Sequence, residues 1–380
     1  MADKPKTRAP KSAPAPAPTE PVAKPARARR TPHAATLADV GREAGVSVMA
    51  ASAVINGSKT SSRFSAETRE RILEAARKLN YRPNAAARAL ADRRMNTIGV
   101  VTTLARNELN QYFLEVFNGV MESAAEAGQN TTVFALSDWQ EGTTRVPQFC
   151  DGRIDGLILL APLMESVQLP EHTPFVSVHA NAQLPGVPNL ESDEEVGAHD
   201  LVSRMIALGH RRILHLAGPS DSIGAQRRVE GWRRAHREAG IEPPPDYLAW
   251  GYYTFDWGRQ GLEAWLARHA GQPLPDAIFG GSDAIALGCM DTLLGRRLRV
   301  PQDVSLAGFD DTALARSAHL STVRQPLREM GHRAVQLLVA QIEAKLKGTA
   351  WRAPGNTVFP TEVIAGQTLA EARTTQIVLP

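Results

Sequence analysis

Apolar residues recur at helical spacing three times between residues 36 and 80 of this 380-residue chain. Thr36, with Asp39 three residues later, has the pattern of a capping box and predicts where the first helix begins. Gly45 favours the tight turn that ends this helix. Its apolar face is expected to consist of Leu37, Val40 and Ala44.

Two further helices follow at short intervals. Ser47 is expected to cap a second helix that runs to about Asn56, with Val54 and Ile55 facing inward. Ser65 is expected to begin a third helix. Its apolar stripe is predicted to be Ile72, Leu73, Ala76 and Leu79. Three helices within about fifty residues, with a glycine in the first turn, are typical of a helix-turn-helix.

The segment after the third helix, Arg82–Leu90, has a proline at its second position and is rich in alanine, which favours a helix. A helix this short is marginal in water by itself. We therefore expect it to be ordered only when another surface supports it.

From Asn96 onward, apolar runs alternate with helical segments. Strands that are apolar on both sides are typical of parallel sheets covered on both faces. The runs are IGVV, TTVFAL, GLILL, FVSV, RILHLAG, AIFGG and VSLAGF. About ten strands in roughly 285 residues fit two doubly wound lobes better than one.

The last helix is predicted near residues 330–345. It carries an apolar stripe of Ala334, Leu337, Leu338 and Ile342. This stripe can pack on the chain's own core or contribute to a dimer interface, and core packing is the safer expectation.

The hydrophobic fraction of 43% is sufficient for substantial cores. The sequence holds no run of eighteen apolar residues and no apolar leader at its N-terminus, so we expect a cytoplasmic protein without a membrane segment. Cys150 and Cys289 lack the spacing of a zinc site or a disulfide framework, and two buried free thiols are expected. No metal and no cofactor are predicted.

Charge is divided unevenly along the chain, although the net charge is only +3. Residues 1–33 carry eight Lys/Arg against two Asp/Glu and hold eight prolines, which is typical of a disordered tail. Residues 34–94 carry eleven basic against six acidic residues, and the remainder is acidic. A basic front end on an acidic body indicates a polyanionic partner for the front end. The tail can attract phosphates through Arg27, Arg29 and Arg30, or act only as a solubilising arm.

Motifs of the common enzymes built on such sheets do not occur. The sequence has no GxSxG elbow, P-loop, GxGxxG after a strand, or HExxH. Asp311 and His179 are conceivable as an acid and a base, yet nothing in the sequence places a nucleophile beside them. We therefore predict a binding protein and not an enzyme.

From Thr36 to the C-terminus the chain resembles the LacI/GalR family of bacterial transcription regulators. The resemblance rests on the order and spacing of TLADVGREAGVS, VINGS, SAETRERILEAARKLNYRPNAAARAL, NTIGVV, IDGLILL, LGHRRILHLAGP, RRVEGW, SDAIALG, RVPQDVSLAGFDD and STVRQPLREMG. It implies an all-α helix-turn-helix head with a hinge helix, joined to a two-lobed, doubly wound α/β core of the periplasmic-binding-protein-like kind. It also implies a homodimer, or a higher oligomer, that holds a near-palindromic double-stranded DNA operator and senses a small-molecule effector.

On this basis the chain divides into four parts. These are a tail at 1–33, a helix-turn-helix DNA-binding domain at 34–81, a hinge helix and linker at 82–95, and an effector-binding and dimerisation core at 96–380. Within the core, one lobe is expected at about 96–190 with 325–355, and the other at 191–322 with 356–380.

The second helix of a helix-turn-helix enters the major groove, where its first residues meet base edges. Here those residues are Val48 and Met49, where many relatives carry polar side chains, and Ala53 stands where relatives carry Arg. Val48 and Met49 can still contact thymine methyl groups, or can be packing residues that read little sequence. Ser47 can contact DNA or only cap the helix.

Members of the family insert a leucine from each hinge helix between base steps in the minor groove, and Leu90 occupies the matching position. Leu90 as an ordinary linker residue is the alternative. Residues 58–63 suit phosphate contacts or form a solvated loop. Sequence preference is expected to depend more on Leu90 than on Val48 and Met49. The expected DNA-binding residues are Thr36, Ser47, Val48, Met49, Ser52, Asn56, Lys59, Arg63, Tyr81, Asn84, Ala87, Arg88 and Leu90.

The same resemblance places the effector between the lobes, at the carboxyl ends of the strands. Arg228 and Asp310 are the pair expected to grip vicinal hydroxyls, while aromatic rings stack on the apolar face of the ligand. This chemistry suits a sugar first and a nucleoside second. The expected effector-binding residues are Thr102, Tyr112, Phe113, His179, Arg228, Tyr253, Ser282, Asp283 and Asp310.

Three of these residues have other interpretations. Asp283 begins a predicted helix and is more often a capping group there. Asp310, with Asp311, can form a solvated turn. His179 stands where relatives often carry Asp, and a buried histidine with its nitrogens satisfied is equally expected.

The sequence therefore predicts a sequence-specific transcription regulator of the nucleoid, most simply a repressor. A ligand between the lobes would shift the spacing of two hinges, so that the marginal hinge helices fold or melt. A DNA-binding architectural protein of low sequence specificity is the alternative. A sugar-transport protein with a similar core would need a secretion signal and would lack residues 36–90.

Overall fold

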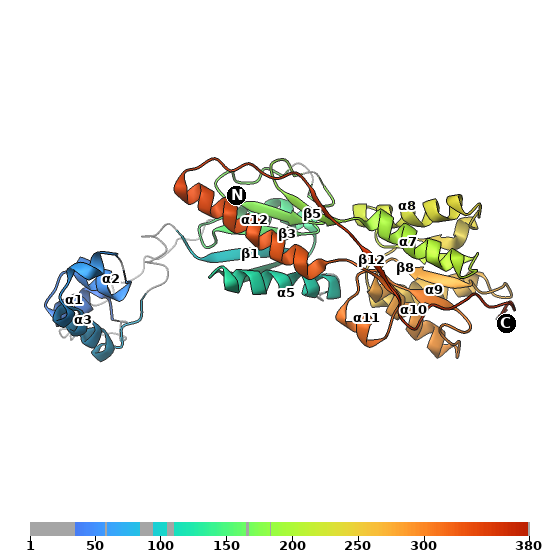
Figure 1. Ribbon diagram of the computed structural model, residues 1–380, viewed down its shortest axis with the longest axis horizontal. Coiled ribbons are helices and arrows are strands. Elements are labelled where there is room, and N and C mark those ends of the chain that lie inside the picture. The colour runs from blue at the N-terminus through green and yellow to red at the C-terminus, as the bar shows by residue number, and fades with distance from the viewer. Residues whose placement is uncertain are drawn as a thin grey trace, which may run out of the picture. The chain divides into compact units, whose positions relative to one another are not determined.

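The computed structural model describes residues 35–57, 59–83, 94–104, 110–164, 167–182 and 184–378. These residues form two compact units, divided after Asn84: a small helical head and a larger α/β core (Figure 1). The expected tail at 1–33 and residues 84–93 of the expected hinge lie outside the described residues.

The head buries one small apolar core between its helices. It contains α1 (Leu37–Ala44), α2 (Val48–Ile55), the 3₁₀ turn η1 (Lys59–Arg63) and α3 (Ala66–Lys78). The three predicted helices are confirmed, and Thr36 forms the expected capping box with Asp39. The core consists of Val40, Ala44, Ala51, Val54, Ile72 and Ala75.

Leu73 is the exception to the predicted apolar stripe of α3. Its side chain is 41% exposed, whereas Ile72 and Ala75 are buried and Ala76 and Leu79 pack partly on the same core. The stripe follows the i, i+3, i+4 and i+7 positions that start at Ile72, and Leu73 lies beside it. The prediction for Leu73 is therefore wrong.

The first lobe of the core is built on a six-stranded sheet in which every neighbouring pair is parallel. Its strands are β1 (Thr97–Thr103), β2 (Asn130–Leu136), β3 (Gly156–Leu160), β4 (Phe175–Val178), β5 (Asn189–Ser192) and β11 (Thr357–Phe359), in the order β11-β5-β4-β3-β1-β2. This confirms the expected parallel sheet.

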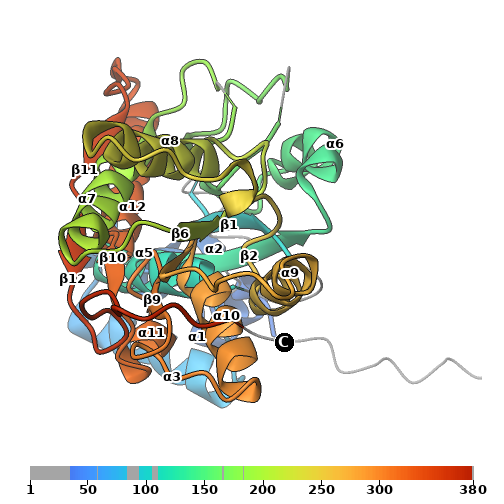
Figure 2. The same cartoon turned by 90° about the vertical axis from the view of Figure 1, so that its right-hand side faces the viewer.

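Successive residues of these strands serve opposite faces of the sheet. Val100 packs with α5 (Gln111–Glu126) and α12 (Leu327–Lys347). The next residue, Val101, packs with α6 (Trp139–Phe149) on the other face (Figure 2). Both faces are therefore covered, which explains why the strands read as continuous apolar runs.

The second lobe holds a four-stranded parallel sheet in the order β7-β6-β8-β9. Its strands are β6 (Ile213–Leu216), β7 (Leu248–Ala249), β8 (Ala277–Gly280) and β9 (Ser305–Ala307). On one face lie α7 (Glu194–Ala207) and α8 (Ile223–Glu238), and on the other lie α9 (Phe255–Arg268) and α10 (Asp283–Gly295), as Figure 1 shows. The short helix α11 (Ala313–Ser317) and the 3₁₀ turn η2 (Pro245–Tyr247) complete this lobe.

The described chain crosses between the lobes three times: between β5 and α7, before α12, and after β11. The strand β10 (Thr322–Arg324) pairs antiparallel with β12 (Glu362–Ile364) at the edge of the second lobe. The expected division gives residues 356–380 wholly to the second lobe, but Thr357–Phe359 pair with β5 of the first sheet. The boundary in this part of the chain therefore falls between β11 and β12.

The predicted stripe of α12 packs on its own lobe. Ala334, Leu337, Leu338 and Ile342 all belong to the apolar core beneath the first sheet.

No helix within the described ranges is both long and apolar enough to cross a membrane. Both cysteines are free; Cys289 is buried as expected, whereas Cys150 is only half-buried.

The core of the second lobe contains a fully buried histidine. His215, on β6, donates from Nδ1 to the backbone carbonyl of Phe279 at 2.9 Å, and its ring stacks on the Phe279 ring at a centroid distance of 4.3 Å. Its Nε2 is buried without a partner. Burial lowers the pKa of His215 to about 3, so the ring is neutral in the folded protein.

We expect acid to destabilise the second lobe through His215. Below the ordinary histidine pKa of about 6.5 the unfolded chain binds a proton that the folded chain does not, so stability present at pH 7 is lost as pH falls from 6.5 towards 3. Between pH 7 and pH 5 this residue should lower the free energy of unfolding by about 2 kcal/mol. Urea unfolding at both pH values measures the loss.

The variant His215→Gln should show a correspondingly shallower pH dependence, even if it is less stable at pH 7. The exposed His172 supplies the matched control, since His172→Gln should keep the wild-type slope. An unchanged slope in His215→Gln would contradict the assignment.

Candidate functional site

The exposed start of α2 is the candidate DNA-reading surface. Ser47 caps the helix by accepting the N–H of Ala50 at 3.1 Å. The next two side chains, Val48 and Met49, are 47% and 83% exposed. Packing inside the head therefore does not account for them, and both are available to thymine methyl groups.

The other expected DNA-binding residues of the head have different surroundings. Asn56 ends α2 and donates from Nδ2 to Oγ of Ser52 at 3.1 Å. Thr36 and Arg63 are exposed, at the start of α1 and at the end of η1, whereas Tyr81 packs partly on the head core. Lys59 begins η1, and Asn84, Ala87, Arg88 and Leu90 lie outside the described residues.

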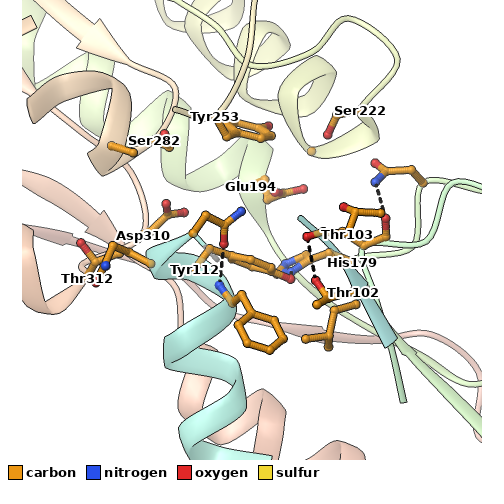
Figure 3. A pocket seen from close by; sticks show the side chains of 18 of the residues that line it. Thr102, Thr103, Tyr112, His179, Glu194, Ser222, Tyr253, Ser282, Asp310 and Thr312 are labelled. Atoms are coloured by element: carbon orange, nitrogen blue, oxygen red, sulfur yellow. Dashed lines mark hydrogen bonds between the residues drawn. The ribbon is translucent and has the colours of Figure 1, made fainter. Parts of the chain in front are cut away.

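A cavity of about 130 Å³ lies between the two lobes of the core (Figure 3). Its walls follow the carboxyl ends of strands and the first turns of helices, where doubly wound sheets place ligands. Eight of the nine expected effector-binding residues line it: Thr102, Tyr112, Phe113, His179, Arg228, Tyr253, Ser282 and Asp310. The lining also includes Thr103, Asn110, Gln111, Leu160, Ala161, Asn181, Glu194, Ser222, Gly224, Ala284 and Thr312. Within the described ranges, no group of three or more His, Cys, Asp or Glu side chains is arranged to hold a metal ion.

Arg228, from α8, is the buried positive charge of this cavity, with 5% of the residue exposed. It donates from Nη2 to Oε1 of Glu194 at 2.8 Å and from Nη1 to the backbone carbonyl of Gly281. The same Nη2 lies 3.8 Å from Oδ1 of Asp310. Burial alone would lower the pKa of Arg228, but Tyr253 and the two carboxylates raise it, so the guanidinium stays charged.

Asp310 follows β9 with a backbone φ of +127°, which residues other than glycine rarely adopt. Its Oδ1 accepts a hydrogen bond from Nε2 of Gln325 at 2.6 Å. Burial raises the pKa of this carboxyl, although Arg228 opposes the shift. Asp310 and Asp311 are both buried, so the solvated-turn interpretation is wrong. Strained backbone of this kind clusters at binding and catalytic sites.

Glu194 is a cavity residue that the motifs do not predict. It is 3% exposed and opens α7, directly after the crossing from β5. Space for its carboxylate depends on Gly224, because a Cβ at that position would lie 2.3 Å from Oε1. Its place at the carboxyl end of a strand is a usable signal, but an acidic residue in the first turn is too common in helices to indicate a binding role by itself.

His179 lines the cavity and has both ring nitrogens hydrogen-bonded. Its Nε2 accepts the backbone N–H of Ser192 at 3.1 Å, so the neutral ring carries its proton on Nδ1 and donates to Oη of Tyr112 at 2.7 Å. Burial lowers the pKa of His179 and keeps the ring neutral. The hydroxyl hydrogen of Tyr112 then points to another acceptor, which a ligand can supply.

Asp283 is the one expected effector-binding residue that does not line the cavity. It is fully buried at the first position of α10. One carboxylate oxygen accepts the N–H of Thr312 at 2.7 Å and the other accepts the hydroxyl of Thr322. The structure thus places Asp283 behind the cavity wall, where it holds the start of α10 to the neighbouring segments.

Tyr253 brings a hydroxyl without a partner to the cavity. Its ring lies 5.2 Å from the guanidinium carbon of Arg228 and, in Figure 3, on the side of the cavity opposite Tyr112 and His179. Its Oη is buried and makes no hydrogen bond of good geometry among the described residues, although the Ser222 hydroxyl lies near enough to oppose the rise of its pKa. Burial raises the pKa of Tyr253 to about 12. An unpaired buried hydroxyl costs free energy that a bound ligand can recover.

Comparison with known proteins identifies the family. Residues 36–84 match the bacterial regulatory proteins of the lacI family, and residues 202–369 match the periplasmic binding protein-like domain. The ribose operon repressor of Escherichia coli (strain K12) is 34% identical over 319 residues, which cover 81% of this chain and 93% of that protein. The chain belongs to the LacI family. Its helix-turn-helix head and two-lobed core are thus parts of a DNA-binding transcription regulator.

Solved structures of similar proteins agree with this LacI-family architecture. A lac repressor dimer bound to operator and the anti-inducer ONPF is 27% identical, with a TM-score of 0.74 over 89% of this chain and 100% of that one. A complex of the transcriptional regulator CelR with cellobiose is 28% identical, with a TM-score of 0.63 over 88% and 99% of the two chains.

The unpaired hydroxyl of Tyr253 gives a test of the cavity in this LacI-family protein. Tyr253→Phe removes at most a poorly formed contact with Ser222 from the unliganded core, so thermal unfolding should show nearly unchanged stability. Affinity for a bound sugar or nucleoside should fall roughly tenfold, as the loss of one ligand hydrogen bond implies. Isothermal titration calorimetry measures this affinity.

Tyr247→Phe, in the core of the second lobe and outside the cavity lining, is the matched control and should leave ligand affinity unchanged. If Tyr253→Phe destabilised the unliganded protein and bound the ligand as well as wild type, the hydroxyl would have a structural role and no contact with the ligand.

Proposed function

We propose that this regulator is a dimeric repressor that binds a near-palindromic operator and responds to a small polyhydroxylated effector in the cavity between its lobes. The observation that carries the proposal is the cavity itself, which combines the Arg228, Glu194 and Asp310 cluster with the rings of Tyr112 and Tyr253. Charged donors and acceptors grip hydroxyls, and aromatic rings cover the apolar face of a sugar or a base.

A sugar is the first choice of effector and a nucleoside the second. The names of the similar proteins support this order, since one is a ribose operon repressor and another was solved with cellobiose. A binding role, and not a catalytic one, suits the site because its charged side chains are committed to one another.

The head is proposed to meet the operator through the start of α2 and through the hinge. Val48 and Met49 offer apolar contacts to thymine methyl groups, which discriminate bases weakly. Leu90 stands where family members insert a leucine into the minor groove, so we assign it the larger share of operator affinity. With chromosomal DNA as the partner, we expect the protein at the nucleoid, in the cytoplasm.

Effector control is proposed to act through closure of the lobes. Contacts across the cavity already join them: Oδ1 of Asn181 accepts the N–H of Ile223 at 2.8 Å, and Oε1 of Glu115 accepts the N–H of Ala313 at 3.0 Å and pairs with Arg316 at 2.9 Å. A ligand that binds one lobe spacing more tightly than another shifts the population of states. The spacing of two marginal hinge helices in the dimer then changes, and with it operator affinity.

Leu90→Ala is expected to weaken operator binding about tenfold or more, and Met49→Ala to weaken it less, because an inserted wedge supports a bent site that contacts more protein. Fluorescence anisotropy with an operator duplex and a scrambled duplex at one salt concentration measures both variants. A larger loss for Met49→Ala would reject this order. Equal affinity of the wild type for the two duplexes would favour an architectural DNA-binding protein.

A thermal-shift screen of sugars and nucleosides is expected to find a stabilising ligand. At a hundred times its dissociation constant, such a ligand adds about 2.7 kcal/mol to the stability of the folded state. The same ligand should change operator affinity in the anisotropy assay. If no member of either class stabilises the protein, the sensing role of the cavity is refuted.

A further inference from the structure

The charges of the cavity are unequal, because two buried carboxylates face one buried guanidinium. We propose that the cavity selects a neutral polyhydroxylated ligand over any anionic one, such as a phosphorylated sugar, and that Glu194 is the residue that sets this selectivity. This inference rests on the proposed effector site and narrows the ligands that it accepts.

Among the described residues that line the cavity, Arg228 is the one cationic side chain, and groups of the protein already accept its hydrogen bonds. Nη1 donates to the Gly281 carbonyl and Nη2 to Glu194, while Asp310 lies within ion-pair distance. Only Nε remains without a partner. Arginine binds a phosphate through paired N–H groups, and here the Glu194 carboxylate and the Gly281 carbonyl compete with a phosphate for that fork.

The helix starts around the cavity are also occupied by the protein's own groups. Free N–H groups at a helix N-terminus attract anions. Here first-turn N–H groups of four helices are accepted by the side chains of Asn110, Ser222, Ser282 and Thr312. The helices α7 and α10 begin with the carboxylates of Glu194 and Asp283. One N–H at each of the four helix starts is therefore already accepted, and the carboxylates at the starts of α7 and α10 repel an anion.

No second cation offsets the excess of carboxylates in the described lining. His179 is neutral, since its Nε2 accepts a backbone N–H and burial lowers its pKa. Arg227 stands outside the lining and pairs with Glu191 at 3.2 Å, while its Nη1 is 3.9 Å from Glu194. An anion would therefore meet buried carboxylates that outnumber the cations of the described lining, and repulsion between buried like charges is strong.

In contrast to an anion, an uncharged ligand with hydroxyl groups finds hydrogen-bonding partners in the cavity. The carboxylates of Glu194 and Asp310 can each accept further hydrogen bonds. The hydroxyls of Tyr253 and Tyr112 have hydrogen-bonding capacity left over. A ligand with several hydroxyls and no charge satisfies all four groups at once.

The experiment compares wild type with Glu194→Gln and Asp310→Asn in the full-length protein. Glu195→Gln is the matched control, since Glu195 is the next residue of the same helix but pairs with Arg234 away from the cavity lining. The probes are D-ribose, D-ribose 5-phosphate and inorganic phosphate, titrated by calorimetry at constant ionic strength. All four proteins share the same DNA-binding head, so phosphate binding there cancels in the comparison.

Wild type and Glu195→Gln should bind neither phosphate probe in the cavity. Glu194→Gln should gain about tenfold or more in affinity for both phosphate probes, because a unit negative charge a few ångströms away is removed while the side-chain shape is kept. Asp310→Asn should gain in the same direction, which provides a second reading if one variant folds poorly.

Wild type that binds D-ribose 5-phosphate as tightly as D-ribose, or variants that gain no phosphate affinity, would overturn the proposal. The gain of phosphate binding does not require D-ribose to be the natural effector. A failed sugar and nucleoside screen combined with a phosphate gain in Glu194→Gln would therefore refute the effector class of the proposed function and leave the role of Glu194 standing.

Discussion

The burial of Arg228 between two carboxylates is the interaction on which the cavity depends. A charge taken out of water costs several kcal/mol unless partners and hydrogen bonds compensate it. Glu194, Asp310 and the carbonyl of Gly281 provide that compensation, and each is held in place by the fold. Glu194 is fixed by the start of α7 and by the space above Gly224, and Asp310 by a strained turn after β9. The cavity is therefore shaped by electrostatic demands as much as by packing.

The same cluster is continuous with the segments that join the lobes. From Asp310 the hydrogen bonds run through Gln325 to the hydroxyl of Ser192, and from the backbone N–H of Ser192 to His179 and on to Tyr112. Ser192 ends β5 at one crossing, and Gln325 lies between β10 and α12 at another. A ligand that moves either end of this chain therefore acts directly on the segments about which the lobes must turn. This supplies a physical connection between ligand contact and lobe geometry.

Local sequence patterns predict most of the helices and strands. They fail for residues whose surroundings are determined by segments far away in the sequence. Thr36, Asp39 and Ser47 form their caps because capping depends only on neighbours along the chain. The prediction for Leu73 is wrong because Ile72 and Leu73 are both apolar neighbours on α3, and the packing of α1 and α2 on α3 buries only Ile72. Glu194 was missed because its role depends on Arg228, 34 residues later, and on a glycine that leaves room for it. The effector residues were located by family resemblance, since their meeting point is a property of two sheets and not of any one segment.

The three crossings also determine the order in which the chain can fold. The first sheet is complete only when β11 pairs with β5, and its apolar face is covered only when α12 packs on it. Both segments follow almost the whole second lobe in the sequence, and β12 must still return to pair with β10. During synthesis the first lobe therefore has an open strand edge and an uncovered apolar surface until α12 and β11 leave the ribosome. Such late, non-local pairing slows folding and makes the nascent chain prone to aggregate.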